Sequence, residues 1–376
     1  MRLYDTARGR IVPFEPGPLV TLYSCGITPY DSAHLGHAQV YLTFDILQRR
    51  LRDLGHDTRC VRNVTDVDDS LLRKAREMGV YYLDLAAEEM ARFDADMGAL
   101  GLLPVYSEPR ATSAIADILS LIGAMLETGH AYEAGGSVYF DVSTFAAFGR
   151  LSGFDHPTML RLAEEHGGNP NDPHKRNPLD FVLWQPSLAD EPAWESRWGP
   201  GRPGWHIECS ALARRELGDT IDIHGGGRDL VFPHHECEVA QCESVTNKPF
   251  VRHWLHVGLI ALDSKKMSKS LGNLVFVADL LKEFEPMAVR LALLAHHYRG
   301  DWEWHRDDAE EAAARLERWR AAPTTTADAE HDRGLDIVRR ALDDDLDTPA
   351  ALARLDECVS SGHPVAHGAA LLGVEL

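Results

Sequence analysis

Apolar residues near the start of the chain are spaced as in a strand, a helix and a second strand. Residues 19–25 (Leu-Val-Thr-Leu-Tyr-Ser-Cys) predict the first strand. Residues 35–54 carry apolar side chains at helical spacing and end at Gly55, which is typical of a helix and its stop. Residues 58–61 predict the second strand. Because a strand–helix–strand unit favours a parallel sheet, the predicted fold class is α/β.

The pattern downstream divides the chain into segments. Residues 113–126 predict an amphipathic helix, and short strands such as 137–142 then alternate with stretches rich in Gly, Pro, Asn and Asp. The last part is helical in pattern, with a linker at 323–326 and helices near 334–344 and 349–361. We expect a Rossmann-like parallel-sheet domain for nucleotide binding, an insertion domain and a C-terminal helical domain. The predicted boundaries are 1–129 for the first half of the catalytic domain, 130–200 for the insertion, 201–275 for the second half with a lysine loop, and 276–376 for the helical domain.

Composition narrows the class of protein. The 376 residues, 44% hydrophobic and 26% charged, predict a soluble protein of two or three domains. Neither an apolar signal region at Met1 nor a membrane-spanning run is found, so we expect a cytoplasmic protein without membrane contact. Six scattered cysteines favour metal binding or burial over a disulfide framework. The net charge of −20 argues against a large polyanionic partner, although a local basic patch stays possible.

Two short motifs are candidates for phosphate chemistry. His34 and His37 flank Gly36 at the start of the first predicted helix, where backbone N–H groups and the helix dipole favour an anion. Lys266 and Lys269, in Lys-Met-Ser-Lys-Ser, could neutralise a triphosphate as charge develops on pyrophosphate. Each motif alone is more often an ordinary polar turn. Their combination, in this order on an α/β pattern, indicates a nucleotide-activating enzyme.

A glycine run is a further nucleotide-site candidate. Gly225, Gly226 and Gly227, with Asp229 beyond them, follow a strand predicted at 220–224. A turn without side chains would allow a base and ribose to approach the backbone closely.

Four dispersed residues could bind a metal ion. Cys25, Cys209, His234 and Glu238 each fall at the edge of a predicted element, and the last two are four apart, as on one face of a helix. Zinc prefers thiolate and imidazole ligands in tetrahedral geometry. On these residues alone, buried cysteines and a capping histidine are the better interpretation. The remaining cysteines are expected to be structural; they are Cys60, Cys237, Cys242 and Cys358.

Several segments resemble class I aminoacyl-tRNA synthetases of the cysteine-specific type. Residues 25–37 (Cys-Gly-Ile-Thr-Pro-Tyr-Asp-Ser-Ala-His-Leu-Gly-His) and 266–270 resemble their nucleotide-binding signature, and 62–69 also matches. Residues 204–210 and 232–236 resemble cysteinyl-tRNA synthetase segments whose matching positions bind zinc. The resemblance extends over about residues 1–350. It implies activation of L-cysteine as an adenylate with ATP and Mg²⁺.

The resemblance also implies roles for individual residues. His34, His37, Lys266 and Lys269 would be catalytic, and one Zn²⁺ per chain would be held by Cys25, Cys209, His234 and, as an open question, Glu238. Such an ion binds a thiolate far better than a hydroxyl, which would select cysteine over serine. Thr28, Thr65 and Trp205 would contact the amino acid. The full set of expected substrate- and nucleotide-binding positions is Gly26, Ile27, Thr28, Val40, Asn63, Val64, Thr65, Trp205, Gly225, Gly226, Gly227, Arg228, Asp229 and Ile260.

The acceptor of the activated cysteine divides the family into two alternatives. A cysteinyl-tRNA synthetase uses tRNA, whereas a mycothiol ligase joins cysteine to the amine of glucosaminyl-inositol. The acidic net charge of the chain favours the ligase. Residues 165–170 (Glu-His-Gly-Gly-Asn-Pro) also resemble a ligase segment. The C-terminal part is about a hundred residues long, and its motifs at 344–349 and 370–376 are similar to those of the ligase family. Glu238 and the run 235–241 are instead synthetase-like. We expect the ligase, as a monomer that does not use tRNA.

A third interpretation is a non-catalytic relative that senses cysteine or nucleotide. Intact histidine and lysine motifs argue against it.

The sequence does not identify the base that deprotonates the acceptor amine, and Asp229 is named only as a candidate.

Overall fold

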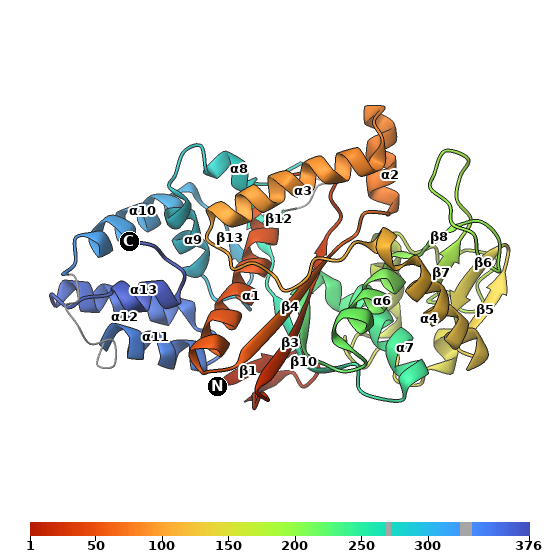
Figure 1. Ribbon diagram of the computed structural model, residues 1–376, viewed down its shortest axis with the longest axis horizontal. Coiled ribbons are helices and arrows are strands. Elements are labelled where there is room, and N and C mark those ends of the chain that lie inside the picture. Colours follow the sequence, from red (N-terminus) through yellow and green to blue (C-terminus); the bar gives the residue numbers. More distant parts are fainter. Residues whose placement is uncertain (268–271, 324–332) are drawn as a thin grey trace.

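A four-stranded parallel sheet lies at the centre of the structure, a computed structural model that describes residues 1–267, 272–323 and 333–376. Its strand order is β10–β9–β3–β4, and neighbouring strands run parallel. Figure 1 shows this sheet in the middle of an elongated molecule, with the C-terminal helices on one side and the insertion on the other. The strands are β3 (Leu19–Ile27), β4 (Asp57–Val64), β9 (Ile221–Gly227) and β10 (Val251–Val257).

The predicted strand–helix–strand unit is confirmed. Helix α1 (Leu35–Asp53) connects β3 to β4 and is buried along most of its length. His34 caps its start, because the ring accepts a hydrogen bond from the Gly36 backbone N–H. The helix ends at Asp53 and is capped by Leu54, and Gly55 follows with a φ of +89°, a conformation that glycine adopts at little cost.

The insertion carries a sheet of its own, which is antiparallel. Its strand order is β5–β6–β7–β8, and its apolar face packs with α4 (Ile115–Glu127) and α6 (Trp205–Leu217). The helix predicted at 113–126 is confirmed as α4, preceded by a short 3₁₀ turn. The predicted domain boundaries stay a prediction. The elements are η1 (Ala111–Ala114), β5 (Ala131–Ala134), β6 (Ser137–Phe140), η2 (Val142–Thr144), α5 (His156–Glu165), β7 (Phe181–Gln185) and β8 (Arg202–Pro203).

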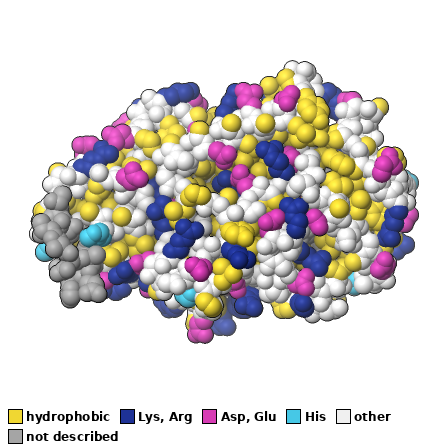
Figure 2. Space-filling view, viewed as in Figure 1, with side chains coloured by type: hydrophobic (Ala, Val, Ile, Leu, Met, Phe, Trp, Pro, Cys, Tyr) yellow, Lys and Arg dark blue, Asp and Glu magenta, His cyan; other side chains and the backbone are white. Residues whose placement is uncertain are grey.

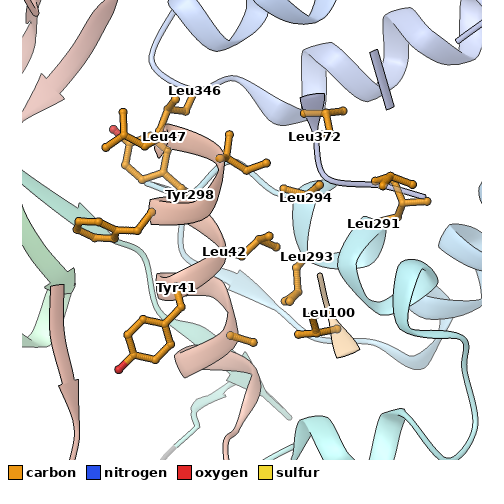
Figure 3. Packing of buried hydrophobic residues seen from close by; sticks show 14 of the residues in the cluster. Tyr41, Leu42, Leu47, Leu100, Leu291, Leu293, Leu294, Tyr298, Leu346 and Leu372 are labelled. Carbon is orange, nitrogen blue, oxygen red and sulfur yellow. The ribbon is translucent and has the colours of Figure 1, made fainter. Parts of the chain in front are cut away.

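The C-terminal helices share a hydrophobic core with α1. Figure 3 shows leucines of α9 facing Leu42 and Leu47 of α1, with Leu372 close by. The helices predicted at 334–344 and 349–361 are confirmed as α11 and α12, whereas most of the predicted linker lies outside the described residues. The elements are α8 (Val277–Leu280), α9 (Pro286–Leu294), α10 (Arg306–Arg320), α11 (Arg333–Asp343), α12 (Thr348–Ser360) and α13 (Ala366–Leu371).

Several elements had no sequence-based prediction. Helix α3 is the long helix that crosses above the sheet in Figure 1. In the part of the chain that the structure describes, no helix combines the length and apolar character needed to cross a membrane. The additional elements are β1 (Arg2–Asp5), β2 (Arg10–Pro13), α2 (Asp69–Met78), α3 (Tyr82–Ala99), η3 (Arg228–Leu230), β11 (Ile260–Leu262), β12 (Lys265–Lys266) and β13 (Trp302–Glu303).

Candidate metal and nucleotide site

The four predicted metal ligands meet near the carboxyl end of the central sheet. One possible ligand atom from each lies within 4.8 Å of those of the other three, and all four side chains are buried. Residues more than two hundred positions apart are therefore brought into one cluster. The ligands are Cys25 from β3, Cys209 from α6 (Trp205–Leu217), His234 from η4 (Val231–His235) and Glu238 from α7 (Glu236–Thr246).

His234 and Glu238 belong to two consecutive segments whose backbone is helical at the junction, and they lie four residues apart as expected from the sequence. The short segment η4 ends at His235 and α7 begins at Glu236, so the pair spans the junction between them. The two side chains meet, with Nε2 of His234 2.8 Å from Oε1 of Glu238. The thiol of Cys25 lies 3.5 Å from the same oxygen.

The cluster changes the acidity of each of its members. Hydrogen bonding with Cys25, supported by the nearby His234, lowers the pKa of Cys209 to about 6. Burial raises the pKa of Cys25 well above its usual value. Burial opposes protonation of His234, but the charges of Cys209 and Glu238 outweigh it and raise its pKa to about 10. The ion pairs with His224 and His234 likewise overcome burial and hold the pKa of Glu238 well below its usual value.

The chemistry of this donor set fits zinc. Two sulfur atoms, one imidazole nitrogen and one carboxylate oxygen are ligand types that Zn²⁺ accepts, and four such atoms match its tetrahedral preference. Acceptor atoms that converge in a buried space repel one another as they ionise, so a bound cation would stabilise them.

Asn63 connects the metal cluster to the expected amino-acid site. Its Oδ1 accepts a hydrogen bond from the Gly26 backbone N–H at 2.9 Å and lies 3.5 Å from Cys209 Sγ, and its amide donates to Thr65 Oγ1 at 3.1 Å. A Cβ on Gly26 would lie 1.4 Å from the Asn63 carbonyl oxygen, so glycine is required there. The Trp205 ring stacks on His234 with centroids 4.3 Å apart. The structure thus brings these predicted residues together.

The nucleotide motif lies at the start of α1. The rings of His34 and His37 stack 3.7 Å apart, beside the N-terminal backbone of the helix. Residues that follow the lysine loop return to this point, because Leu35 N–H donates to Val275 O at 3.0 Å and Val277 N–H to Ala33 O at 2.9 Å. Helix dipole, imidazoles and the returning segment therefore converge on one place that suits an anion.

The lysines of the second motif are only partly described. Strand β12 contains the backbone of Lys266 and pairs with β11, whose first residue is Ile260. The side chain of Lys266, and Lys269 as a whole, lie outside the described residues.

The other expected positions are mostly apolar residues of the neighbouring elements. Ile260 and Val64 are buried at strand ends, and Val40 is partly buried in α1. Ile27 ends β3, and its carbonyl accepts from Thr65 N–H at 3.0 Å, with Thr28 next in the chain. Their part in nucleotide binding stays a prediction.

Comparisons with known proteins identify the family of the chain. The model of the family described as "tRNA synthetases class I (C) catalytic domain" matches residues 12–314. The chain belongs to this family. A Thermobispora bispora protein named L-cysteine:1D-myo-inositol 2-amino-2-deoxy-α-D-glucopyranoside ligase is 49% identical over 95% of the chain and 89% of the relative. A protein of the same name from Nakamurella multipartita is 46% identical over 100% of the chain and 95% of the relative.

Solved structures of class I synthetases share the fold. Mycobacterium tuberculosis methionyl-tRNA synthetase, in complex with methionyl-adenylate, superposes with a TM-score of 0.67 over 91% of this chain and 84% of that one, at 17% identity. At that identity the likeness supports the Rossmann-like α/β fold and nothing about the substrate.

In this synthetase-family chain, the glycine run is not a turn after a strand, which corrects the sequence-based expectation. Strand β9 continues through Gly227, and Asp229 lies in the following turn η3. A Cβ on Gly225 would lie 1.7 Å from the Leu255 carbonyl oxygen of β10, so glycine there is required by the neighbouring strand. Arg228 donates to Asp301 at 2.9 Å, which ties this turn to the segment after α9.

Sequence reasoning missed four histidines around the cluster. His224 and His235 form a second set with Cys25 and Glu238, again with ligand atoms within 4.8 Å of one another. His256 contacts His235, with Nε2 and Nδ1 2.7 Å apart, and the remaining histidine is His206. The position of His235 directly beside His234 was the available signal. The others become neighbours only through the pairing of β9 with β10 and the packing of α6 on α7.

Proposed function

We propose that the chain is an ATP-dependent, AMP-forming ligase that activates L-cysteine and joins it to the amine of glucosaminyl-inositol, a step of mycothiol biosynthesis. The observation that carries the proposal is the group of relatives named for this reaction, which are 46–49% identical over 95% or more of the chain. The buried cluster of thiols beside an anion-binding helix start supports it independently, because such a site suits a thiol-bearing substrate and a nucleotide.

In the first step, a carboxylate oxygen of cysteine attacks the α-phosphorus of ATP, and pyrophosphate leaves. We assign His34 and His37 to hold the phosphates at the start of α1, and Lys266 and Lys269 to neutralise the developing charge, with Mg²⁺ accompanying ATP. The products are cysteinyl-adenylate and pyrophosphate.

Selection of cysteine belongs to the metal cluster in this proposal. Cys25, Cys209 and His234, with Glu238, would hold a zinc ion, and zinc lowers the pKa of a bound thiol and binds it as thiolate. Thr28, Thr65 and Trp205 would contact the rest of the amino acid. Asn63 keeps Gly26, Thr65 and Cys209 in register for this task.

In the second step, the neutral amine attacks the carbonyl carbon of the adenylate, AMP leaves, and an amide forms. The amine nitrogen loses one proton in this step. Asp229 is our candidate for its acceptor, because η3 follows directly from the end of β9 beside Cys25. The remaining nucleotide-binding assignments stay as the family resemblance implies.

Transfer to tRNA is the second candidate function, since the matching family is named for tRNA synthetases. The charge of the chain argues against it, at −20 overall. Figure 2 shows Lys and Arg interspersed with Asp and Glu on the face in view. A polyanionic backbone is bound by clustered positive charge, whereas a small amine-bearing sugar does not need it.

The deciding experiment gives the purified chain ATP and labelled cysteine with either glucosaminyl-inositol or tRNA. We expect AMP and a labelled amide with the sugar alone, and no labelled tRNA. Labelled tRNA without amide would establish the alternative. Cysteine-dependent ATP–pyrophosphate exchange, with serine as the control, separates both enzymes from a non-catalytic sensor, which would show no exchange. Cytoplasmic location and a monomeric state remain predictions.

A further inference from the structure

The two ring nitrogens of His234 face different surroundings. Nε2 lies 2.8 Å from Glu238 Oε1 and so faces the cluster of expected metal ligands. Nδ1 lies on the other side of the ring, 2.9 Å from Nδ1 of His206. A neutral histidine carries one ring proton, so a ring that offers Nε2 to a cation keeps its proton on Nδ1. In that state Nδ1 of His234 must donate, and Nδ1 of His206 must accept.

The position of His206 follows from its helix. It lies three residues before Cys209 on α6, so both side chains project from one face of the helix toward η4 and α7. The same helix begins at Trp205, whose ring stacks on His234. One turn of α6 thus supplies a ligand, a stacking surface and a hydrogen-bond acceptor for a ligand on another element.

We propose that His206 is a positioning residue for His234. Its Nδ1 accepts the Nδ1–H of His234, which fixes the orientation of the ring and leaves Nε2 as the nitrogen turned toward the ion. The inference rests on the metal site of the proposed function and adds a residue outside its ligand set. Partners of this kind that orient a metal-bound histidine typically change metal affinity by about 10–100-fold when removed.

A purely structural role for His206 makes the opposite prediction about substitutions. The ring packs edge-on against Phe181, with centroids 5.7 Å apart, and lies beside Trp205. If packing alone mattered, phenylalanine would replace it well and asparagine poorly. If the hydrogen bond matters, asparagine replaces it well, because the amide oxygen of asparagine occupies nearly the position of Nδ1.

The test measures Zn²⁺ affinity of the full chain by competition with a chromophoric chelator. We expect His206→Phe to bind zinc about 10–100-fold more weakly than the unmodified chain. His206→Asn should recover most of that loss. His206→Gln is equally polar, but its amide oxygen lies near the position of Nε2, so it should recover little of the affinity. If His206→Phe does not fold, His206→Gln takes its place in the comparison with His206→Asn. His253→Asn, a buried histidine that contacts the Tyr4 carbonyl, is the control and should leave affinity unchanged.

Two results would overturn the inference. One is zinc affinity in His206→Phe equal to that of the unmodified chain, and the other is His206→Asn binding no more tightly than His206→Gln. Failure of the proposed function looks different. If the unmodified chain binds no zinc, both the metal site and this inference are refuted. If the chain makes no amide but the variants show the expected order of zinc affinities, the proposed function is refuted and the inference stands.

Discussion

Two groups of buried ionisable side chains in this chain are built on opposite principles. Arg290 of α9 is fully buried, and its guanidinium donates to the Leu372 and Leu100 carbonyl oxygens at 2.8 and 2.9 Å and to the Asp45 carboxylate. Asp45 also accepts from Arg49 at 2.8 Å. Around the metal cluster, thiols, imidazoles and a carboxylate instead converge, with their possible ligand atoms within 4.8 Å of one another.

The contrast between these two groups distinguishes a buried charge that stabilises the fold from a candidate metal-binding site. The guanidinium finds its hydrogen-bond partners within the protein, so its burial cross-links α1, α9 and the C-terminal segment. Among the described residues, the basic side chains that contact the cluster's Cys25 and Glu238 are all histidines. A buried group of thiols and a carboxylate whose basic neighbours are all histidines is suited to binding a metal cation.

The largest effect should come from removing a ligand of the metal cluster. In Cys209→Ala we expect loss of bound zinc and a fall in cysteine-dependent ATP–pyrophosphate exchange of at least about 10³-fold, since a metal–sulfur bond worth several kcal/mol is lost. The preference for cysteine over serine should disappear with it. Cys60→Ala, which removes a buried cysteine of β4 outside the cluster, is the matched control. Retained selectivity in Cys209→Ala would show that thiolate ligation is not what chooses the substrate.

The sequence predicted the scaffold better than the surroundings of the site. The unit of β3, α1 and β4 has a strong local pattern, and Cys25, Cys209, His234 and Glu238 were identified through motif resemblance. The glycine run was mistaken for a turn because Gly225 is required by the close approach of Leu255 on the next strand, and no local pattern encodes a strand neighbour. Similarly, Arg290 gave no signal, because its partners lie 82, 190 and 245 positions away.

Removing the buried guanidinium should destabilise the fold without touching the metal cluster. For Arg290→Met we expect a loss of about 3–5 kcal/mol in the free energy of unfolding, because Asp45 is left buried with a weaker set of partners. Urea unfolding measures it, and zinc content of the folded fraction should stay unchanged. Loss of zinc at unchanged stability would show that the two groups are coupled.

Arg339 provides the matched control for that experiment. It pairs with Asp53 at 2.7 Å and also connects the C-terminal helices to α1, but it is 35% exposed. Water already screens this pair, so Arg339→Ala should cost no more than about 1 kcal/mol. A cost equal to that of Arg290→Met would mean that burial is not what distinguishes the two arginines.

The prediction that best separates the two groups is the pH dependence of zinc binding. Burial raises the pKa of Cys25, and the charges of Cys209 and Glu238 outweigh burial to raise that of His234 to about 10, so both carry protons near pH 7. The pKa of Cys209, lowered to about 6, leaves it already ionised. Zinc must displace the two protons, which are bound in the metal-free chain and absent from the complex.

Affinity should therefore rise with pH between about 7 and 9, by up to about 100-fold per pH unit if both protons leave. Calorimetric titrations with Zn²⁺ in buffers of different ionisation enthalpy count the protons directly. Arg290→Met should leave this count unchanged, because an arginine does not titrate in this range. A pH-independent affinity would mean that zinc binds elsewhere than at Cys25 and His234, since no zinc ligand can keep a proton on its donor atom.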